Sequence, residues 1–188
     1  RDPCRGRGLR QGARGVSKVA IVTGGARGIG RGCALELANR GYDIALVDLL
    51  EPEMARTKGE IEAKGRKALA YKADVAVFGR AHEIAEDVAE RWGRIDFLLN
   101  DAGASNAKGI LEIKEEEFDR TIAVNLKSCF NYIHAIAPIM LKQDDGGPRA
   151  LLSIKEALDY GANPGTIFLG LRDGAPVFGM GMSPASAE

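Results

Sequence analysis

The sequence predicts an α/β fold built on a doubly wound parallel sheet that is incomplete on its C-terminal side. From Lys18 to about Gln143, strand-like apolar runs alternate with helical patterns, which is typical of βαβ units. A glycine-rich turn follows the first apolar run and an aspartate ends the second, as dinucleotide-binding sites require. At 188 residues, the chain suits one such domain and is short for two.

The glycine-rich turn occupies residues 23–30, with the sequence Thr-Gly-Gly-Ala-Arg-Gly-Ile-Gly, and a helical pattern follows it. Gly24 permits a tight turn, Gly28 lets the backbone approach a phosphate, and Gly30 lets the helix pack on the strand. A helix N-terminus attracts a pyrophosphate through its unpaired N–H groups and its dipole. The spacing alone would also fit a turn without a ligand, but Asp48 follows at the distance where a carboxylate reaches the ribose hydroxyls.

The remaining elements are expected in the order that a parallel sheet needs. Glycines at the ends of the first two helical patterns support these boundaries. The last and longest helical pattern is expected to break around residues 123–125 and to kink at Pro138. By residue number, the expected helices are at about 28–40, 52–64, 77–92 and 114–141, and the strands that follow the first are at 44–48, 68–71 and 95–99.

Residues 18 to about 143 resemble the short-chain dehydrogenase/reductase family. The resemblance implies a Rossmann-type fold and NAD(P)-dependent hydride transfer between nicotinamide and a secondary alcohol or ketone. Four family motifs have counterparts here in order: Thr-Gly-x-x-x-Gly-x-Gly in Thr23–Gly30, the adenine-contacting Asp-Val in Asp74-Val75, Asn-Asn-Ala-Gly in Asn100-Asp101-Ala102-Gly103, and the Val-Asn of the central helix in Val124-Asn125.

The resemblance implies a cofactor site at the carboxyl ends of the strands, where open α/β sheets bind ligands. The glycine turn would surround the pyrophosphate and the neighbouring ribose. Asp74 would accept a hydrogen bond from the adenine amino group, and Val75 would pack on the ring. The residues expected to form this site are Thr23, Gly24, Arg27, Gly28, Ile29, Gly30, Asp48, Leu49, Asp74, Val75, Asn100, Ala102 and Gly103.

The choice between NAD and NADP depends on two residues with opposite effects. Asp48 favours NAD, because a carboxylate that holds the ribose hydroxyls would repel the 2′-phosphate of NADP. Arg27 favours NADP, because a basic residue just before the second motif glycine occurs in NADP-preferring members of the family. We give Asp48 more weight, since it would face the extra phosphate directly, and NAD is the expected cofactor.

The family's chemistry also needs a Tyr-x-x-x-Lys pair, a serine that polarises the substrate oxygen, and an asparagine that supports the lysine. Asn125 matches the asparagine, and Ser153 lies roughly where the serine would be, in a poorly matching context. Tyr160, the only tyrosine after the central helix, is followed four residues later by Pro164. Two hypotheses therefore stay open: an oxidoreductase of which this chain is a truncated or altered copy, and a non-catalytic nucleotide-binding or interaction module.

Two segments fall outside the family pattern. Residues 1–17 contain five arginines among glycines and are expected to form a disordered basic arm, with nucleic-acid binding as the alternative. Residues 144–188 form an atypical tail, in which Asp173-Gly174 between apolar runs indicates a β-hairpin. Three origins of this tail stay open: a reading-frame error or splice variant, a genuine replacement segment, and a truncated product.

Composition limits the partners that the chain is expected to have. The 26 basic and 26 acidic residues balance, which gives no indication of nucleic acid or an anionic membrane. The apolar stretches are shorter than the roughly 20 residues of a membrane span, so a cytoplasmic protein is expected. The scattered cysteines and isolated histidines predict neither a disulfide framework nor a metal site. The family resemblance implies a small alcohol or ketone substrate and a homo-oligomer, here with an incomplete interface.

Overall fold

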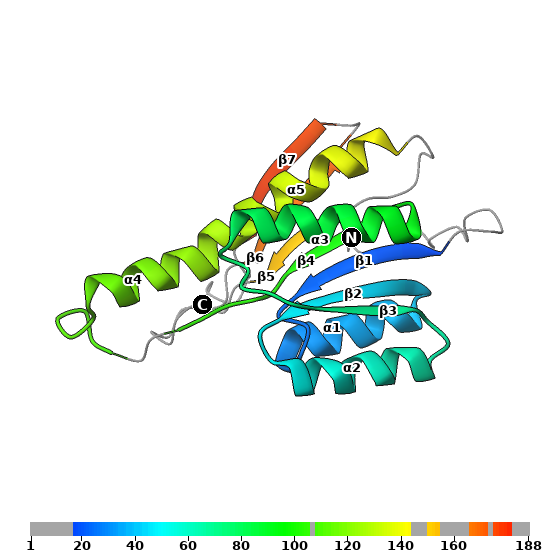
Figure 1. Cartoon of the computed structure of the whole chain (residues 1–188). Helices are drawn as coiled ribbons and strands as arrows, with labels where there is room; N and C mark the ends of the chain where they lie inside the picture. Colours follow the sequence, from blue (N-terminus) through cyan, green and yellow to red (C-terminus); the bar gives the residue numbers. More distant parts are fainter. Residues whose placement is uncertain (1–16, 106–107, 144–149, 155–165, 173–174, 182–188) are drawn as a thin grey trace, which may run out of the picture.

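The computed structural model describes residues 17–105 and 108–143 and the strands at 150–154, 166–172 and 175–181. The strands within these ranges form one sheet in the order β3-β2-β1-β4-β5-β6-β7 (Figure 1). Neighbours from β3 to β5 pair in parallel, whereas β6 and β7 are antiparallel. The bounds are Lys18–Thr23 for β1, Tyr42–Asp48 for β2, Ala68–Lys72 for β3, Phe97–Asn100 for β4, Ala150–Ile154 for β5, Thr166–Arg172 for β6 and Ala175–Gly181 for β7.

Helices cover both faces of the parallel part of the sheet (Figure 1). Strands β1 and β2 have nearly continuous apolar sequences because both of their faces are buried. Alternate residues of β1 separate two cores: Val19 and Ile21 pack toward α3 and α5, and Ala20 and Val22 toward α1 and α2. The helices are α1 Gly28–Asn39, α2 Glu51–Ala63, α3 Phe78–Trp92, α4 Glu115–Ile122 and α5 Ser128–Lys142.

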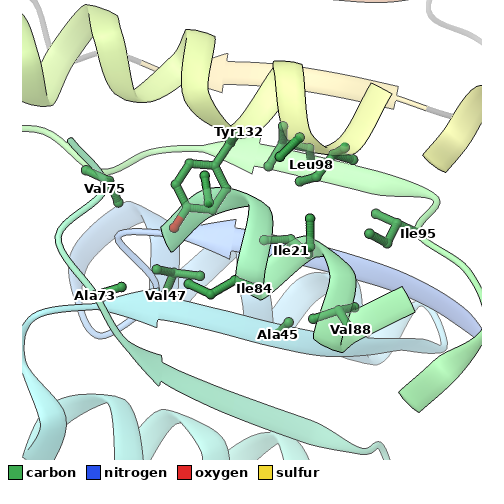
Figure 2. Close-up of a cluster of buried hydrophobic side chains, with 14 of the residues drawn as sticks. Ile21, Ala45, Val47, Ala73, Val75, Ile84, Val88, Ile95, Leu98 and Tyr132 are labelled. Atoms are coloured by element: carbon green, nitrogen blue, oxygen red, sulfur yellow. The ribbon is translucent and has the colours of Figure 1, made fainter. Parts of the chain in front are cut away.

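The core under α3 and α5 contains the largest fully buried side chain, that of Tyr132 (Figure 2). Its ring lies among aliphatic side chains such as Val47, Val75 and Ile84. The hydroxyl has no hydrogen-bond partner within the described residues, and burial raises the pKa of this phenol. Tyr132 is therefore a neutral core residue, and its position makes it unsuitable as a catalytic base.

The doubly wound α/β fold predicted from the sequence is confirmed, and its helices begin and end within two residues of the expected positions. The helix does change around residues 123–125, but the expected break is wrong. The chain there continues as a π-helical turn, Ala123–Lys127, that joins α4 to α5. A π-turn adds one residue to a helical turn without ending the helix. Pro138 lies inside α5. Among the described residues, every helix is too short or too polar to span a membrane.

The chain after Gln143 adds strands to the same sheet. β5 pairs in parallel with β4, with Ser153 in register with Asn100. β6 and β7 pair antiparallel to each other on the two sides of residues 173–174. Residues 1–16 of the predicted basic arm lie outside the described residues, and so do the connections within the tail, so their expected character stays a prediction.

Candidate functional site

The carboxyl ends of β1 to β4 meet at one edge of the sheet. Thr23 at the end of β1 is in register with Val47 on one side and with Asn100 on the other. The strand order reverses between β1 and β4, because the chain runs outward from β1 to β3 and then returns to the other side of β1. This reversal is the topological switch point at which open α/β sheets bind ligands.

The glycines of the turn after β1 meet different steric conditions. At Gly24, where φ is +72°, an added Cβ would lie 2.8 Å from the Ala102 amide nitrogen. At Gly30 an added Cβ would overlap the Gly24 carbonyl and lie 2.7 Å from the Asp101 carboxylate. At Gly28, where φ is +58°, it would meet no atom within 4 Å. The turn is therefore closely packed on its inner side and open at the N-terminus of α1, which is the space that a phosphate would need.

Asp48 joins the end of β2 to the glycine turn. One carboxylate oxygen accepts a hydrogen bond from the Ala26 amide at 3.0 Å. The other accepts from the amides of Leu49 at 2.7 Å and Leu50 at 3.1 Å. A carboxylate offers about four acceptor positions, so this side chain is held in orientation and keeps capacity for a ribose hydroxyl. It therefore fits the role that the sequence predicts.

Thr23 is hydrogen-bonded to the end of β4 and to the loop that follows it. Its side chain is buried, and its hydroxyl donates to the Leu99 carbonyl at 3.4 Å. The same oxygen accepts from the amides of Asp101 and Ala102, each at 3.2 Å. Thr23 thus holds the loop after β4 against β1. Thr23 is only 1% exposed, and its predicted contact with a cofactor stays a prediction.

The residues expected to bind adenine are held by a contact that the sequence analysis missed. Arg120 of α4 donates to the Asp74 carboxylate at 2.7 Å. The other oxygen of Asp74 accepts from the Ala76 amide at 2.9 Å. Partial burial acts to raise the pKa of Asp74, but the Arg120 and Ala76 hydrogen bonds and the Arg120 charge together lower it. Val75 beside it is only 6% exposed, and it packs mainly into the core.

Asn125 acts on the loop that follows β4. It lies in the π-helical turn, and its amide group donates to the Ala104 carbonyl at 2.6 Å and accepts from the Ala104 amide at 3.2 Å. This pair of bonds fixes the backbone just after Gly103, where an added Cβ would lie 3.1 Å from the Asn125 side-chain oxygen. The π-turn therefore presents a side chain to the loop that ends the site.

The other predicted residues flank this edge. Asn100 is buried at the end of β4, and its register partner on β5 is Ser153. The side chains of Arg27, Ile29 and Leu49 are exposed, and Arg27 has an extended backbone just before α1. The predicted positions from β1 to β4 are thus brought to one edge of the sheet. No signal at helical or strand spacing could have identified Arg120, since it lies 46 residues from Asp74.

A parallel sheet with a glycine turn at its switch point and a carboxylate after the second strand defines a Rossmann-type dinucleotide-binding fold. The model of the short chain dehydrogenase family matches residues 18–147. The chain therefore belongs to the short-chain dehydrogenase family.

Curated relatives and solved structures agree with this membership. The chain is 38% identical over 151 residues to a 3-oxoacyl-[acyl-carrier-protein] reductase, FabG, of Staphylococcus epidermidis, covering 80% of this chain and 61% of that protein. It is 37% identical over 132 residues to a diacetyl reductase of the same species, covering 70% and 51% of the two chains. The chain thus spans between half and two thirds of the length of these relatives.

The structural relatives include proteins solved with either nicotinamide dinucleotide. A putative short-chain alcohol dehydrogenase from Sinorhizobium meliloti has a TM-score of 0.70 at 30% identity, covering 79% of this chain and 58% of that one. A Mycobacterium paratuberculosis short chain dehydrogenase bound to NAD has a TM-score of 0.68 at 28% identity, covering 72% and 55%. A metagenomic short-chain oxidoreductase in complex with NADP has a TM-score of 0.70 at 29% identity, covering 79% and 66%.

Proposed function

We propose that this protein is an NAD(P)-dependent oxidoreductase of the short-chain dehydrogenase type, and that the chain binds the dinucleotide along the carboxyl edge of β1 to β4. The observation that carries the proposal is the open space at Gly28, at the N-terminus of α1, in a turn whose Ala26 amide is hydrogen-bonded to the Asp48 carboxylate. The pyrophosphate would lie against the first amides of α1, the adenosine ribose against Asp48, and the adenine near Asp74.

NAD is the dinucleotide that Asp48 favours. Its carboxylate is held by three backbone amides and therefore has little freedom to turn away from a 2′-phosphate. A 2′-phosphate placed there would meet a fixed negative charge at short range. Arg27, exposed at the start of α1, is the side chain that would partly offset this repulsion. The relatives include complexes with both NAD and NADP, so the preference comes from this chain's own residues.

Hydride transfer is supplied by the nicotinamide when it is bound, and the chain's own residues bind and orient the dinucleotide. The proton that accompanies the hydride needs a second group near the substrate oxygen. Four residues after the tyrosines at 42, 71, 132 and 160 stand Leu46, Val75, Ile136 and Pro164, so the printed sequence contains no Tyr-x-x-x-Lys. This favours a second candidate, a nucleotide-binding module without turnover.

One titration tests both candidates. The full chain is titrated with NADH and with NADPH by fluorescence, and consumption of each is then followed with diacetyl and with an acetoacetyl thioester. Binding with turnover supports the oxidoreductase. Binding without turnover supports the non-catalytic module. If neither dinucleotide binds at millimolar concentration while circular dichroism shows a folded chain, both candidates are wrong.

The cofactor preference has its own test. NADH is expected to bind more tightly than NADPH. In Asp48→Asn the ratio of the NADPH dissociation constant to the NADH dissociation constant should fall at least about tenfold, because the charge is lost while an acceptor for the Ala26 amide is kept. Glu62→Gln, at the far end of α2, removes the same charge and should leave the ratio unchanged. Equal ratios in all three proteins would show that Asp48 does not face the ribose.

A further inference from the structure

The only two histidines of the sequence meet at the surface between α3 and α5. His82 and His134 are separated by 52 residues in sequence, and the Nε2 atom of His82 lies 3.0 Å from the Nδ1 atom of His134. His82 is half-buried and His134 is exposed, so solvent reaches the pair. Two ring nitrogens this close present adjacent ligand positions for a single ion.

The tautomer of His82 follows from its second contact. Its Nδ1 atom lies 3.1 Å from the Phe78 carbonyl oxygen, which can only accept a hydrogen bond, so Nδ1 carries the proton. The Nε2 lone pair of neutral His82 therefore points at His134. Histidines that bind metals almost always donate their other N–H to a carbonyl or carboxylate in this way. The Nδ1 contact with Phe78 thus leaves Nε2 of His82 free of a proton, as a metal ligand must be. An ion bound by both nitrogens lies beside the line of the hydrogen bond, so each ring must turn to aim its lone pair at the ion.

Two phenylalanines restrain both imidazole rings. The Phe78 ring centroid lies 4.4 Å from that of His82 and 5.2 Å from that of His134. The Phe130 ring centroid lies 5.5 Å from that of His134 and 6.0 Å from that of Phe78, on which it stacks. Rings packed against each other lose little further rotational freedom when they bind a ligand, which favours affinity.

We propose that His82 and His134 chelate one divalent transition-metal ion of the Ni²⁺ or Cu²⁺ type through Nε2 and Nδ1. With metal–nitrogen bonds of about 2.05 Å, two nitrogens at a right angle lie about 2.9 Å apart, and two at the tetrahedral angle about 3.3 Å. The hydrogen-bonded nitrogens are 3.0 Å apart, so their separation would change little on binding an ion at the right angle of square-planar or octahedral coordination. The proton on Nδ1 of His134 moves to its Nε2 atom through solvent, so the step releases no net proton.

Water would complete the coordination sphere. Within the described residues, no cluster of three or more His, Cys, Asp or Glu side chains is placed to hold a metal. The nearby charged pair on α3, Arg80 with Glu83, has its two charges matched to each other. The site is therefore a two-histidine chelate, and the ion would connect α3 to α5. The sequence analysis predicted no metal site, because histidines so far apart show no ligand spacing.

The test is calorimetric titration of the full, untagged chain with NiCl₂ at pH 7.5, after alkylation of the cysteines so that thiolates cannot bind the ion. One Ni²⁺ per chain is expected, and the melting temperature should rise by a few degrees. Affinity should fall at least about tenfold in His82→Gln and in His134→Gln, because a second ligand on the same surface acts at high effective concentration. Binding should also weaken as the pH is lowered, because protons compete for the ring nitrogens.

The matched control is Glu90→Gln, an exposed change on α3 that leaves both histidines in place, and its Ni²⁺ affinity should equal that of the parent chain. The electron paramagnetic resonance spectrum of added Cu²⁺ should show coupling to two imidazole nitrogens in the parent chain and to one in each histidine variant. Unchanged Ni²⁺ affinity in both variants, or no binding by the folded parent chain, would overturn the proposal. Neither result bears on dinucleotide binding, since the pair lies outside that site.

Discussion

The two halves of the dinucleotide site are held by different kinds of contact. The phosphate side, residues 24–30 with Asp48, is held through backbone amides: the Gly24 amide donates to the Val47 carbonyl at 2.8 Å, and the Ala26 amide donates to the side-chain carboxylate of Asp48 at 3.0 Å. The adenine side, Asp74 and Val75, is held by a side-chain ion pair with Arg120. The bond between Gly24 and Val47 joins two uncharged backbone groups, so its strength does not depend on pH or on the screening of charges by salt. An exposed ion pair depends on pH and salt.

The largest expected effect is on the phosphate side, at Gly30. In Gly30→Ala the new methyl group would overlap the Gly24 carbonyl, so the free energy of unfolding should fall by about 3 kcal/mol. Gly32→Ala is the matched control, because it lies in the same helix with no atom within 4 Å of the added carbon. It should be neutral or stabilising by up to about 1 kcal/mol. Urea unfolding curves measure both, and equal losses would contradict the close packing at Gly30.

Thr23 tests the contact between the phosphate side and the loop after β4. Thr23→Val keeps the shape but leaves the amides of Asp101 and Ala102 without this acceptor, and should lower the free energy of unfolding by about 1–3 kcal/mol. Thr23→Ser keeps the hydroxyl and should lower the free energy of unfolding by less than Thr23→Val does. Urea unfolding curves of the two variants measure this difference. If the two variants were equally stable, the hydroxyl would not be what holds the loop.

A substitution at Gly28 should affect both dinucleotide binding and stability, and a control at Gly41 distinguishes the two effects. Its φ of +58° is strained for other residues, so Gly28→Ala should lose about 1–2 kcal/mol. Its methyl group would also enter the space left for the phosphate, and affinity for NADH should fall at least about tenfold. Gly41→Ala, with φ of +88° and open space at the other end of α1, carries similar strain away from the site. Gly41→Ala should lose stability and keep its affinity for NADH. If Gly41→Ala and Gly28→Ala both lost affinity for NADH, the space at Gly28 would not be the phosphate site.

The smallest effect is expected on the adenine side. Because the Asp74 pKa is lowered in the folded chain, the pair with Arg120 stabilises the fold at neutral pH, and this contribution is lost as the pH falls through the folded pKa. Arg120→Gln should therefore lose less stability than the parent chain as the pH is lowered from about 5 through the folded pKa of Asp74. At pH 7 the two should differ by no more than about 1 kcal/mol, since the pair is partly exposed.

Arg120→Lys keeps a positive charge at that position and is the matched control. Its loss of stability at acidic pH, measured by thermal unfolding across the pH range, should be close to that of the parent chain. Added salt should reduce the difference between the parent chain and Arg120→Gln by screening the charges. Superimposable pH curves for the parent chain and Arg120→Gln would mean that the ion pair does not set the pH response of the adenine side.

The π-helical turn between α4 and α5 is a part of the fold that the sequence pattern does not predict. The sequence predicts a break around Ala123-Val124-Asn125, and the structure has a wide turn there that continues into α5. Whether an irregular pattern ends a helix or widens it depends on what the turn can contact. Here Asn125 finds the backbone of Ala104 across the loop, a contact that has no counterpart in helical spacing.

The sequence by itself determined the order of strands and helices, the glycine turn and the carboxylate after the second strand. These features depend on neighbouring residues: apolar periodicity, the conformational freedom of glycine and the position of Asp48 directly after a buried run. Only the tertiary structure decided that Arg120 holds Asp74, that Thr23 holds the loop after β4, and that His82 meets His134. Each of these contacts joins residues at least 46 positions apart, and the packing of elements across the sheet, rather than any local pattern, brings them together.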